Sequence, residues 1–154
     1  MQIEVGTDPG LQVTGILALV GTQAIYRASI KTPSTDSDEA RCTFICNRIA
    51  EIAAKLPGAH WTVEDYEYQG ARSKTKNAIR LPRLIGRIQG VLQALGVAHG
   101  MVTRNTWGRA LGIKDDADQR VLLSNLTGLT PNNSHERDAA CCAKYGQRAV
   151  RKAA

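Results

Sequence analysis

The chain has 154 residues, a length that fits one compact domain and leaves little room for a second. Its composition, 43% hydrophobic and 22% charged, is that of an ordinary soluble globular protein. No apolar run approaches the roughly 20 residues of a membrane span and nothing resembles a signal peptide, so we expect an intracellular protein with no membrane partner.

The hydrophobic pattern predicts a three-stranded antiparallel meander at residues 2–7, 15–20 and 24–30. Asp36 or Ser37 would cap the helix that follows, and Ser134 would cap the last helix. The remaining expected elements are helices at 38–56, 77–95, 105–111, 115–126 and 135–151, and strands at 60–66 and 98–103. This order predicts an α/β fold in which a mixed sheet is flanked by helices.

The net charge of +6 suggests a polyanionic partner, and the basic residues are concentrated in two stretches. Six of them are Arg72, Lys74, Lys76, Arg80, Arg83 and Arg87, and four more are Lys144, Arg148, Arg151 and Lys152. Arg80, Arg83 and Arg87 are spaced to share one helical face. We expect this face, or the loop before it, to hold DNA backbone. The alternative is a solvated charged surface.

The four cysteines have no spacing typical of zinc ligands. Cys42 and Cys46 lie four apart in one expected helix, whereas Cys141 and Cys142 are adjacent in another. We therefore expect reduced, buried thiols rather than a metal site or a disulfide framework.

Four potential metal ligands lie where neighbouring elements can bring them together. Asp8 ends the first strand, Glu64 lies near the end of a buried strand, and His135 and Asp138 are one turn apart at the start of the last helix. Carboxylates at strand ends converge on one edge of a parallel-paired sheet. Asp65 is adjacent to Glu64, so only one of the two can face this edge.

This donor set suits the cleavage of a phosphodiester bond. Two Mg²⁺ ions roughly 4 Å apart supply an activated water and neutralise charge on the leaving oxygen, and Mg²⁺ prefers hard oxygen ligands. Asp8 would bridge the ions, Glu64 and Asp138 would flank it, and His135 would complete the set or carry a proton. Taken singly, each residue has an ordinary alternative: a turn residue, a strand-end carboxylate, a surface histidine, or an ion pair of Asp138 with a neighbouring arginine.

Several motifs resemble the RuvC-type Holliday junction resolvases, a family of the ribonuclease H-like superfamily, and the similarity spans nearly the whole chain. The segment VGTDPG at 5–10, continuing through VTG at 13–15, resembles the family's opening. The dipeptide VE at 63–64 resembles its second acidic strand, residues 83–92 its long central helix, and HERDAA at 135–140 its final metal-binding helix.

The resemblance implies a ribonuclease H-like fold and a Mg²⁺-dependent endodeoxyribonuclease, with Mn²⁺ able to substitute, that cuts four-way DNA junctions symmetrically as a homodimer. It would act in recombination and repair in the bacterial cytoplasm, or in phage DNA processing. Carried over, the catalytic and metal-binding set is Asp8, Glu64, His135 and Asp138. The helix at 77–95 would form much of the dimer interface, where Gly86 and Gly90 would permit close approach unless they pack on their own subunit.

The sequence departs from the family where an aromatic wedge is expected. That position holds Glu67, so Tyr68 is the candidate for stacking on an unpaired base. Arg104, Arg109 and Lys114 are candidates for contact with the scissile phosphate.

Three other functions are compatible with the same sequence features. One is a nuclease of the same fold that acts on RNA or flaps, and another is a nucleic-acid-binding module without activity. The third comes from the DPG motif at 8–10, which also resembles the phosphate loop of sugar kinases and actin-like ATPases. Those proteins need two such domains, and this chain has room for one.

Overall fold

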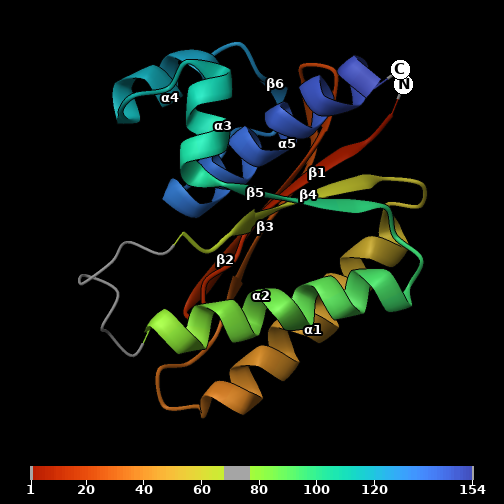
Figure 1. Ribbon diagram of the computed structural model, residues 1–154, viewed down its shortest axis with the longest axis vertical. Helices are drawn as coiled ribbons and strands as arrows, with labels where there is room; N and C mark the ends of the chain where they lie inside the picture. The colour runs from red at the N-terminus through yellow and green to blue at the C-terminus, as the bar shows by residue number, and fades with distance from the viewer. Residues whose placement is uncertain (1, 68–76, 154) are drawn as a thin grey trace.

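A computed structural model describes residues 2–67 and 77–153, apart from the side chains of 77, 78 and 151–153. Six strands form one mixed sheet in the order β5-β4-β1-β2-β3-β6, with two layers of helices on its faces (Figure 1). The strands are β1 (Glu4–Asp8), β2 (Val13–Val20), β3 (Gln23–Lys31), β4 (His60–Asp65), β5 (His99–Thr103) and β6 (Thr127–Gly128). The helices are α1 (Asp38–Lys55), α2 (Asn77–Ala94), α3 (Arg104–Leu111), α4 (Asp116–Leu123) and α5 (Ser134–Ala153).

The first three strands form the expected antiparallel meander, and β4 and β5 add to its β1 edge in parallel. This mixed arrangement confirms the predicted fold class. The two-residue strand β6 was not predicted; it pairs in parallel with β3 within a stretch expected to be loop.

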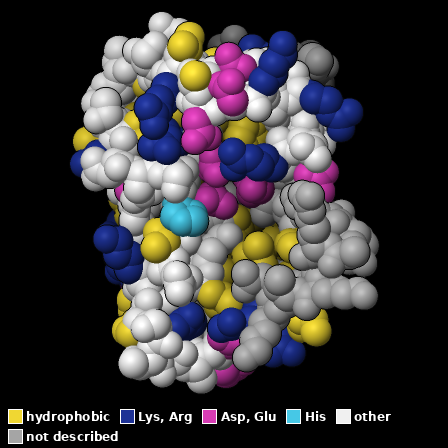
Figure 2. All heavy atoms as spheres, turned by 90° about the vertical axis from the view of Figure 1, so that its left-hand side faces the viewer, with side chains coloured by type: hydrophobic (Ala, Val, Ile, Leu, Met, Phe, Trp, Pro, Cys, Tyr) yellow, Lys and Arg dark blue, Asp and Glu magenta, His cyan; other side chains and the backbone are white. Residues whose placement is uncertain are grey.

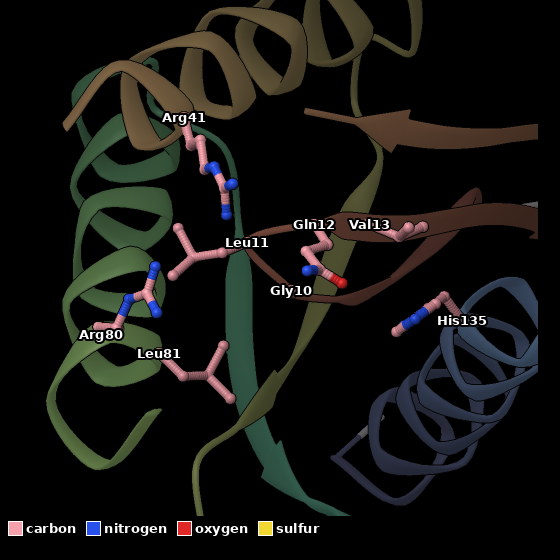
Figure 3. Close-up of a pocket in the computed structure, with 8 residues that line it drawn as sticks. All are labelled: Gly10, Leu11, Gln12, Val13, Arg41, Arg80, Leu81 and His135. Atoms are coloured by element: carbon pink, nitrogen blue, oxygen red, sulfur yellow. The ribbon is translucent and has the colours of Figure 1, made fainter. Parts of the chain in front are cut away.

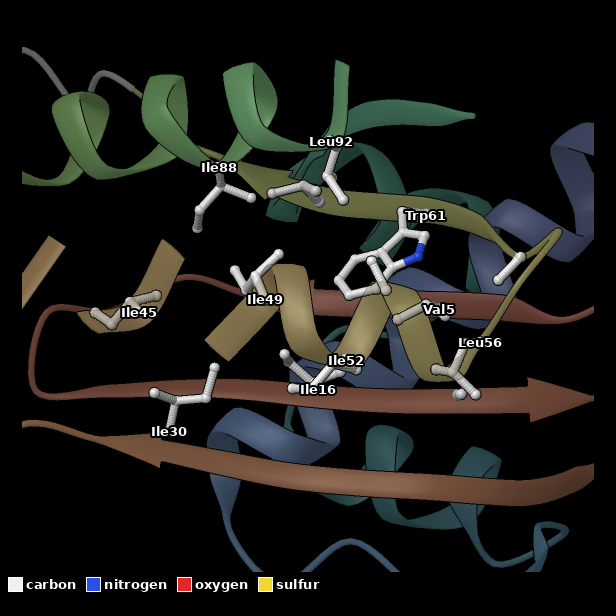
Figure 4. Close-up of a cluster of buried hydrophobic side chains, with 14 of the residues drawn as sticks. Val5, Ile16, Ile30, Ile45, Ile49, Ile52, Leu56, Trp61, Ile88 and Leu92 are labelled. Carbon is white, nitrogen blue, oxygen red and sulfur yellow. The ribbon is translucent and has the colours of Figure 1, made fainter. Parts of the chain in front are cut away.

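Helices α1 and α2 cover one face of the sheet, and α3, α4 and α5 lie on the other (Figure 1). On the first face, isoleucines of α1 and α2 pack against the strands around the fully buried indole of Trp61 (Figure 4). The second face is packed differently, with a run of small residues in α5, from Ala139 to Ala143, against Leu17 and Leu19 of β2. Small side chains let α5 lie close to the sheet.

The helix starts follow local capping chemistry. The Ser37 side chain accepts a hydrogen bond from the Ala40 amide, which confirms one of the two expected caps of α1. The prediction for the last helix was wrong by one residue, because Asn133 rather than Ser134 accepts from the Glu136 amide, at 2.9 Å.

The cysteines are free thiols, as expected. Cys42, Cys141 and Cys142 are buried, whereas Cys46 is only half-buried, so the expectation of burial is wrong for that residue. Burial raises the pKa of Cys141 to about 12. Among the described residues, no helix combines the length and apolar character needed to cross a membrane.

Candidate active site

The pairing of β1 with β4 brings two of the predicted carboxylates to the same end of neighbouring strands. The strands are parallel with Thr7 opposite Val63, so Asp8 and Glu64 occupy the next position on each. Glu64 is half-buried whereas Asp65 is exposed, as the alternation of side chains along a strand requires. The expected convergence of strand-end carboxylates is therefore present.

Two glycines let α5 lie directly on the backbone of β1 and β2. A Cβ atom on Gly6 would lie 1.7 Å from the Ala139 carbonyl oxygen, and one on Gly15 would lie 2.3 Å from the His135 carbonyl oxygen. No larger residue fits at either position without displacing the helix. This close approach places His135 and Asp138, at the start of α5, over the end of β1.

His135 contacts Asp8 directly, with Nδ1 2.7 Å from Oδ2. Burial raises the pKa of Asp8; the bond to His135 opposes that rise, and the charge of Asp138 adds to it. The same bond raises the pKa of His135. The hydrogen bond between the two side chains therefore favours a protonated imidazole beside an ionised carboxylate.

Glu64 has the most perturbed carboxyl group of the site. Its pKa is raised to about 7, first by burial and then by the charge of Asp8, while a hydrogen bond from Trp107 opposes the shift. Trp107 Nε1 donates to Glu64 Oε2 at 2.9 Å. A carboxyl group with a pKa near 7 among other carboxylates is typical of functional sites.

Asp138 is held by two donors from elements far away in the sequence. Arg104 at the start of α3 lies 2.6 Å from Oδ2, and Gln119 of α4 donates to Oδ1 at 2.6 Å. The Arg104 guanidinium also lies over the Trp107 ring, 5.2 Å from its centroid. Acidic side chains gather in the middle of this side of the molecule, with lysines and arginines around them (Figure 2).

All four predicted catalytic residues thus lie in one electrostatically coupled group. Among the described residues, however, no three His, Cys, Asp or Glu side chains converge as they stand into a position that could hold a metal ion. In this arrangement, each carboxylate of the group has at least one oxygen in contact with a neighbouring side chain: His135 at Asp8, Trp107 at Glu64, and Arg104 and Gln119 at Asp138.

Sequence reasoning missed two residues of this group, Trp107 and Gln119. The sequence does offer one indication for Gln119: it lies four positions before Leu123, so both are on the same inner face of their helix. The side chain of Gln119 is only 2% exposed. The indole N–H of Trp107 also needs a partner when buried, but the sequence does not show which one.

The predicted DNA-binding residues divide into three groups. Arg104, Arg109 and Lys114 line one small cavity of about 150 Å³ beside the site. Of the basic face on α2, Arg83 is exposed, but Arg80 and Arg87 form ion pairs with α1, so this face is not the uniformly free basic surface that we expected. Tyr68, Arg72, Lys74 and Lys76 lie outside the described residues, as do the side chains of Arg151 and Lys152.

No family model matches the chain, and no curated protein does. Solved structures do match. RuvC of Thermus thermophilus is similar over 99% of this chain and 97% of its own, with a TM-score of 0.80 and 19% identity. The same protein in complex with a Holliday junction substrate gives a TM-score of 0.79 at 20% identity, over 99% and 96% of the two chains. The yeast mitochondrial Holliday junction resolvase Ydc2 gives 0.63 at 8%, over 98% and 84%.

These similarities extend over nearly the whole of each chain, including the elements that carry Asp8, Glu64, His135 and Asp138. The chain has the ribonuclease H-like fold of the RuvC-type Holliday junction resolvases.

Proposed function

We propose that this protein is a metal-dependent endonuclease that cleaves phosphodiester bonds in branched DNA, with four-way junctions as its main substrate. The observation that carries the proposal is the group formed by Asp8, Glu64, His135 and Asp138 at the carboxyl end of β1 and β4. The fold shared with RuvC, one of whose structures is a complex with a Holliday junction substrate, supports the choice of DNA substrate.

The donor set fits divalent metal ions chemically. Burial raises the pKa values of both Asp8 and Glu64, and the charge of Asp138 raises both further through repulsion. The charge of Asp8 adds to the rise for Glu64. A cation would offset this repulsion, and carboxylate oxygens are the ligands that Mg²⁺ and Mn²⁺ prefer. Asp8, Glu64, Asp138 and His135 would hold two ions, which would activate a water and neutralise the leaving oxygen. To bind them, the carboxylates must exchange some of their present donors.

The neighbouring residues orient the carboxylates of the site and can hold or transfer a proton there. Trp107 fixes one oxygen of Glu64, and Gln119 fixes one oxygen of Asp138. His135 Nδ1 is positioned to hold or pass a proton at Asp8 Oδ2. The side chain of Arg104 is half-exposed, and it would be able to leave Asp138 for a nearby phosphate.

We also propose that the protein acts as a homodimer that uses α2 as its interface. Gly86 and Gly90 lie on the exposed side of α2, and a Cβ atom at either position would meet nothing within 4 Å. The alternative, that these glycines pack on their own subunit, is wrong. A helix face without side chains at two successive turns permits close approach of a second helix.

The decisive test is cleavage of a mobile four-way DNA junction, a Y-fork, a linear duplex and their RNA counterparts, each with Mg²⁺, Mn²⁺ or EDTA. We expect paired symmetric nicks in the junction that are lost with EDTA and with Asp8→Asn. The matched control is Asp65→Asn, which changes an exposed carboxylate on the same sheet edge and should preserve cleavage.

Other outcomes would redirect the proposal. Equal cutting of every branch would indicate a general branch nuclease, and cutting of RNA alone would indicate the other substrate class. An absence of metal-dependent cutting would leave a nucleic-acid-binding module.

A further inference from the structure

A cavity next to the candidate active site contains a buried arginine that the proposed chemistry does not use. The cavity has a volume of about 340 Å³ and lies between the β1–β2 turn, the first turns of α1 and α2, and the start of α5 (Figure 3). Its lining residues are Gly10, Leu11, Gln12, Val13, Arg41, Arg80, Leu81 and His135.

Arg41 is an unusual residue to find in this wall. It is only 5% exposed, and its buried Nε atom has no hydrogen-bond partner. A buried, charged donor without a partner costs free energy, and such a group in a folded protein commonly marks the place of a ligand. The side chain extends from α1 toward Leu11 at the cavity (Figure 3).

The other polar groups make the cavity suitable for an anion. Arg80 reaches toward the same space from α2, and its charge is shared with Asp38, to which its Nε donates at 2.5 Å. Arg41 therefore supplies positive charge beyond that of the Arg80–Asp38 pair. Arginine presents a planar set of N–H donors that matches a phosphate group.

Part of the remaining wall is apolar, which points to an occupant larger than a free anion. Leu11, Val13 and Leu81 line the cavity, and its volume falls within the ~300–1,000 Å³ typical of small-molecule pockets. A nucleotide matches both kinds of wall, because its phosphate is anionic and suits the arginines, and the faces of its base are apolar and suit the leucines.

His135 connects this cavity to the candidate active site. It lines the cavity, and its Nδ1 atom lies 2.7 Å from Asp8 Oδ2. An occupant of the cavity would therefore lie next to His135, one side chain away from Asp8.

We propose that the cavity binds one unpaired nucleotide of the DNA strand being cut, next to the scissile phosphate. The phosphate of this nucleotide lies against Arg41 and Arg80, and its base lies against Leu11 and Leu81, with the Gln12 amide available to its edge. This inference rests on the proposed nuclease function and adds a site that holds the strand in register.

The direct test is a titration of the full chain in EDTA, followed through the NMR signal of the Arg41 Nε–H group. The probes are thymidine 5′-monophosphate, inorganic phosphate and thymidine. We expect the nucleotide to shift the signal at concentrations where phosphate and thymidine have much weaker effects. An equal response to phosphate would indicate a simple anion site and overturn the nucleotide proposal, as would no response to any probe.

A second test uses Arg41→Met, with Arg48→Met as the matched control. Arg48 is on the same helix, but it is exposed and pairs with Glu51 at the surface. Loss of one charge-assisted phosphate contact should weaken binding of a four-way junction in EDTA about tenfold. It should also lower the log–log salt slope by about one, and Arg48→Met should change neither value.

The thermal stability of Arg41→Met separates binding from a structural role. Because the wild-type guanidinium has an unpaired buried donor, we expect an unchanged or higher Tm together with the weaker binding. A lower Tm with wild-type binding would make Arg41 a structural residue and overturn the proposal.

The two proposals fail separately. If the protein binds the nucleotide at Arg41 but cuts no DNA, the proposed pocket is supported and the proposed nuclease function is wrong. If Arg41→Met changes neither junction cleavage nor junction binding, the proposed pocket is wrong and the proposed nuclease function is unaffected.

Discussion

At the scale of single residues, Glu64 makes the stability of the metal-free protein depend on pH. Its pKa is raised from 4.5 to about 7, so ionising it costs more in the folded chain than in the unfolded chain. The metal-free protein should therefore lose stability as the pH rises from about 4.5 to about 7. The Glu64→Gln variant, whose side chain does not ionise, should be more stable than the wild type by about 1–2 kcal/mol at pH 8 in EDTA.

Thermal unfolding at pH 5 and pH 8 checks this prediction. The two proteins should have similar stability at pH 5, and the difference should shrink at pH 8 when Mg²⁺ is added to the wild type. Asp65→Asn is the control, because the neighbouring carboxylate is exposed and should show no such gain. Equal stabilities of wild type and Glu64→Gln at pH 8 would contradict the raised pKa.

Trp107 opposes the rise in the pKa of Glu64 through the hydrogen bond from its indole. Trp107→Phe keeps an aromatic ring and removes the donor, so the pKa of Glu64 should rise further. We expect the acidic limb of the pH–rate profile for junction cleavage to move to higher pH. The control is Trp61→Phe in the other core cluster, where the indole nitrogen has no partner; it should lower stability without moving the limb.

At the scale of elements, the close approach of α5 to the sheet makes the site sensitive to substitution of the glycines beneath the helix. Gly15→Ala would place a Cβ atom 2.3 Å from the His135 carbonyl oxygen, so the start of α5 must move away from β2. Overpacking of this kind typically costs about 1–3 kcal/mol. Cleavage should fall more than stability alone explains, because His135 and Asp138 move with the helix.

Denaturant unfolding and cleavage assays of Gly15→Ala test this point against Gly100→Ala in β5. A Cβ atom on Gly100 would meet nothing within 4 Å, so that variant should retain both stability and activity. If Gly15→Ala behaved like Gly100→Ala, the helix would not be held in place by the glycine.

The sequence predicts the long elements well and the short ones poorly. Each long helix has apolar residues at helical spacing, and each buried strand has a run of apolar or β-branched residues, so their positions were confirmed. The strand β6 has only two exposed residues, Thr127 and Gly128, and it exists through pairing with β3, which no local pattern encodes. The cap at Asn133 was missed because Ser134, the next residue, is an equally good cap former.

The candidate site was predictable to the extent that topology alone determines it. Parallel pairing of two strands brings Asp8 and Glu64 together, and the spacing of His135 and Asp138 puts them on one helix face. The partners Trp107 and Gln119 were not predictable, because they reach Glu64 and Asp138 from helices whose docking depends on side-chain packing. The ion pairs of Arg80 and Arg87 with α1 were not predictable either, because the spacing of these arginines within α2 does not show which helix packs beside them.

At the scale of the whole molecule, the exposed face of α2 determines the expected assembly. Gly90→Glu would place a charged side chain where a second subunit should lie, and should give a monomer by light scattering. Because a Cβ atom at Gly90 has no neighbour in its own subunit, the monomer should remain folded. The control Ala117→Glu changes an exposed position on α4, on the opposite side of the sheet, and should leave the dimer intact.

Symmetric paired nicking of a junction requires two active sites in one assembly. The Gly90→Glu monomer should therefore nick single strands and lose the coordinated second cut. A wild-type protein that is monomeric at micromolar concentration, even with junction DNA bound, would contradict the proposed dimer.

The position of α5 across β1 also matters during synthesis. The group of four residues joins Asp8 to His135 and Asp138, which are synthesised about 130 residues later. A nascent chain that ends before residue 134 can form β1 and β4, yet it contains neither of the two α5 residues of the group. The proposed cleavage activity would thus be absent from such fragments, and it would become available only together with α5, which completes the core on the second face of the sheet.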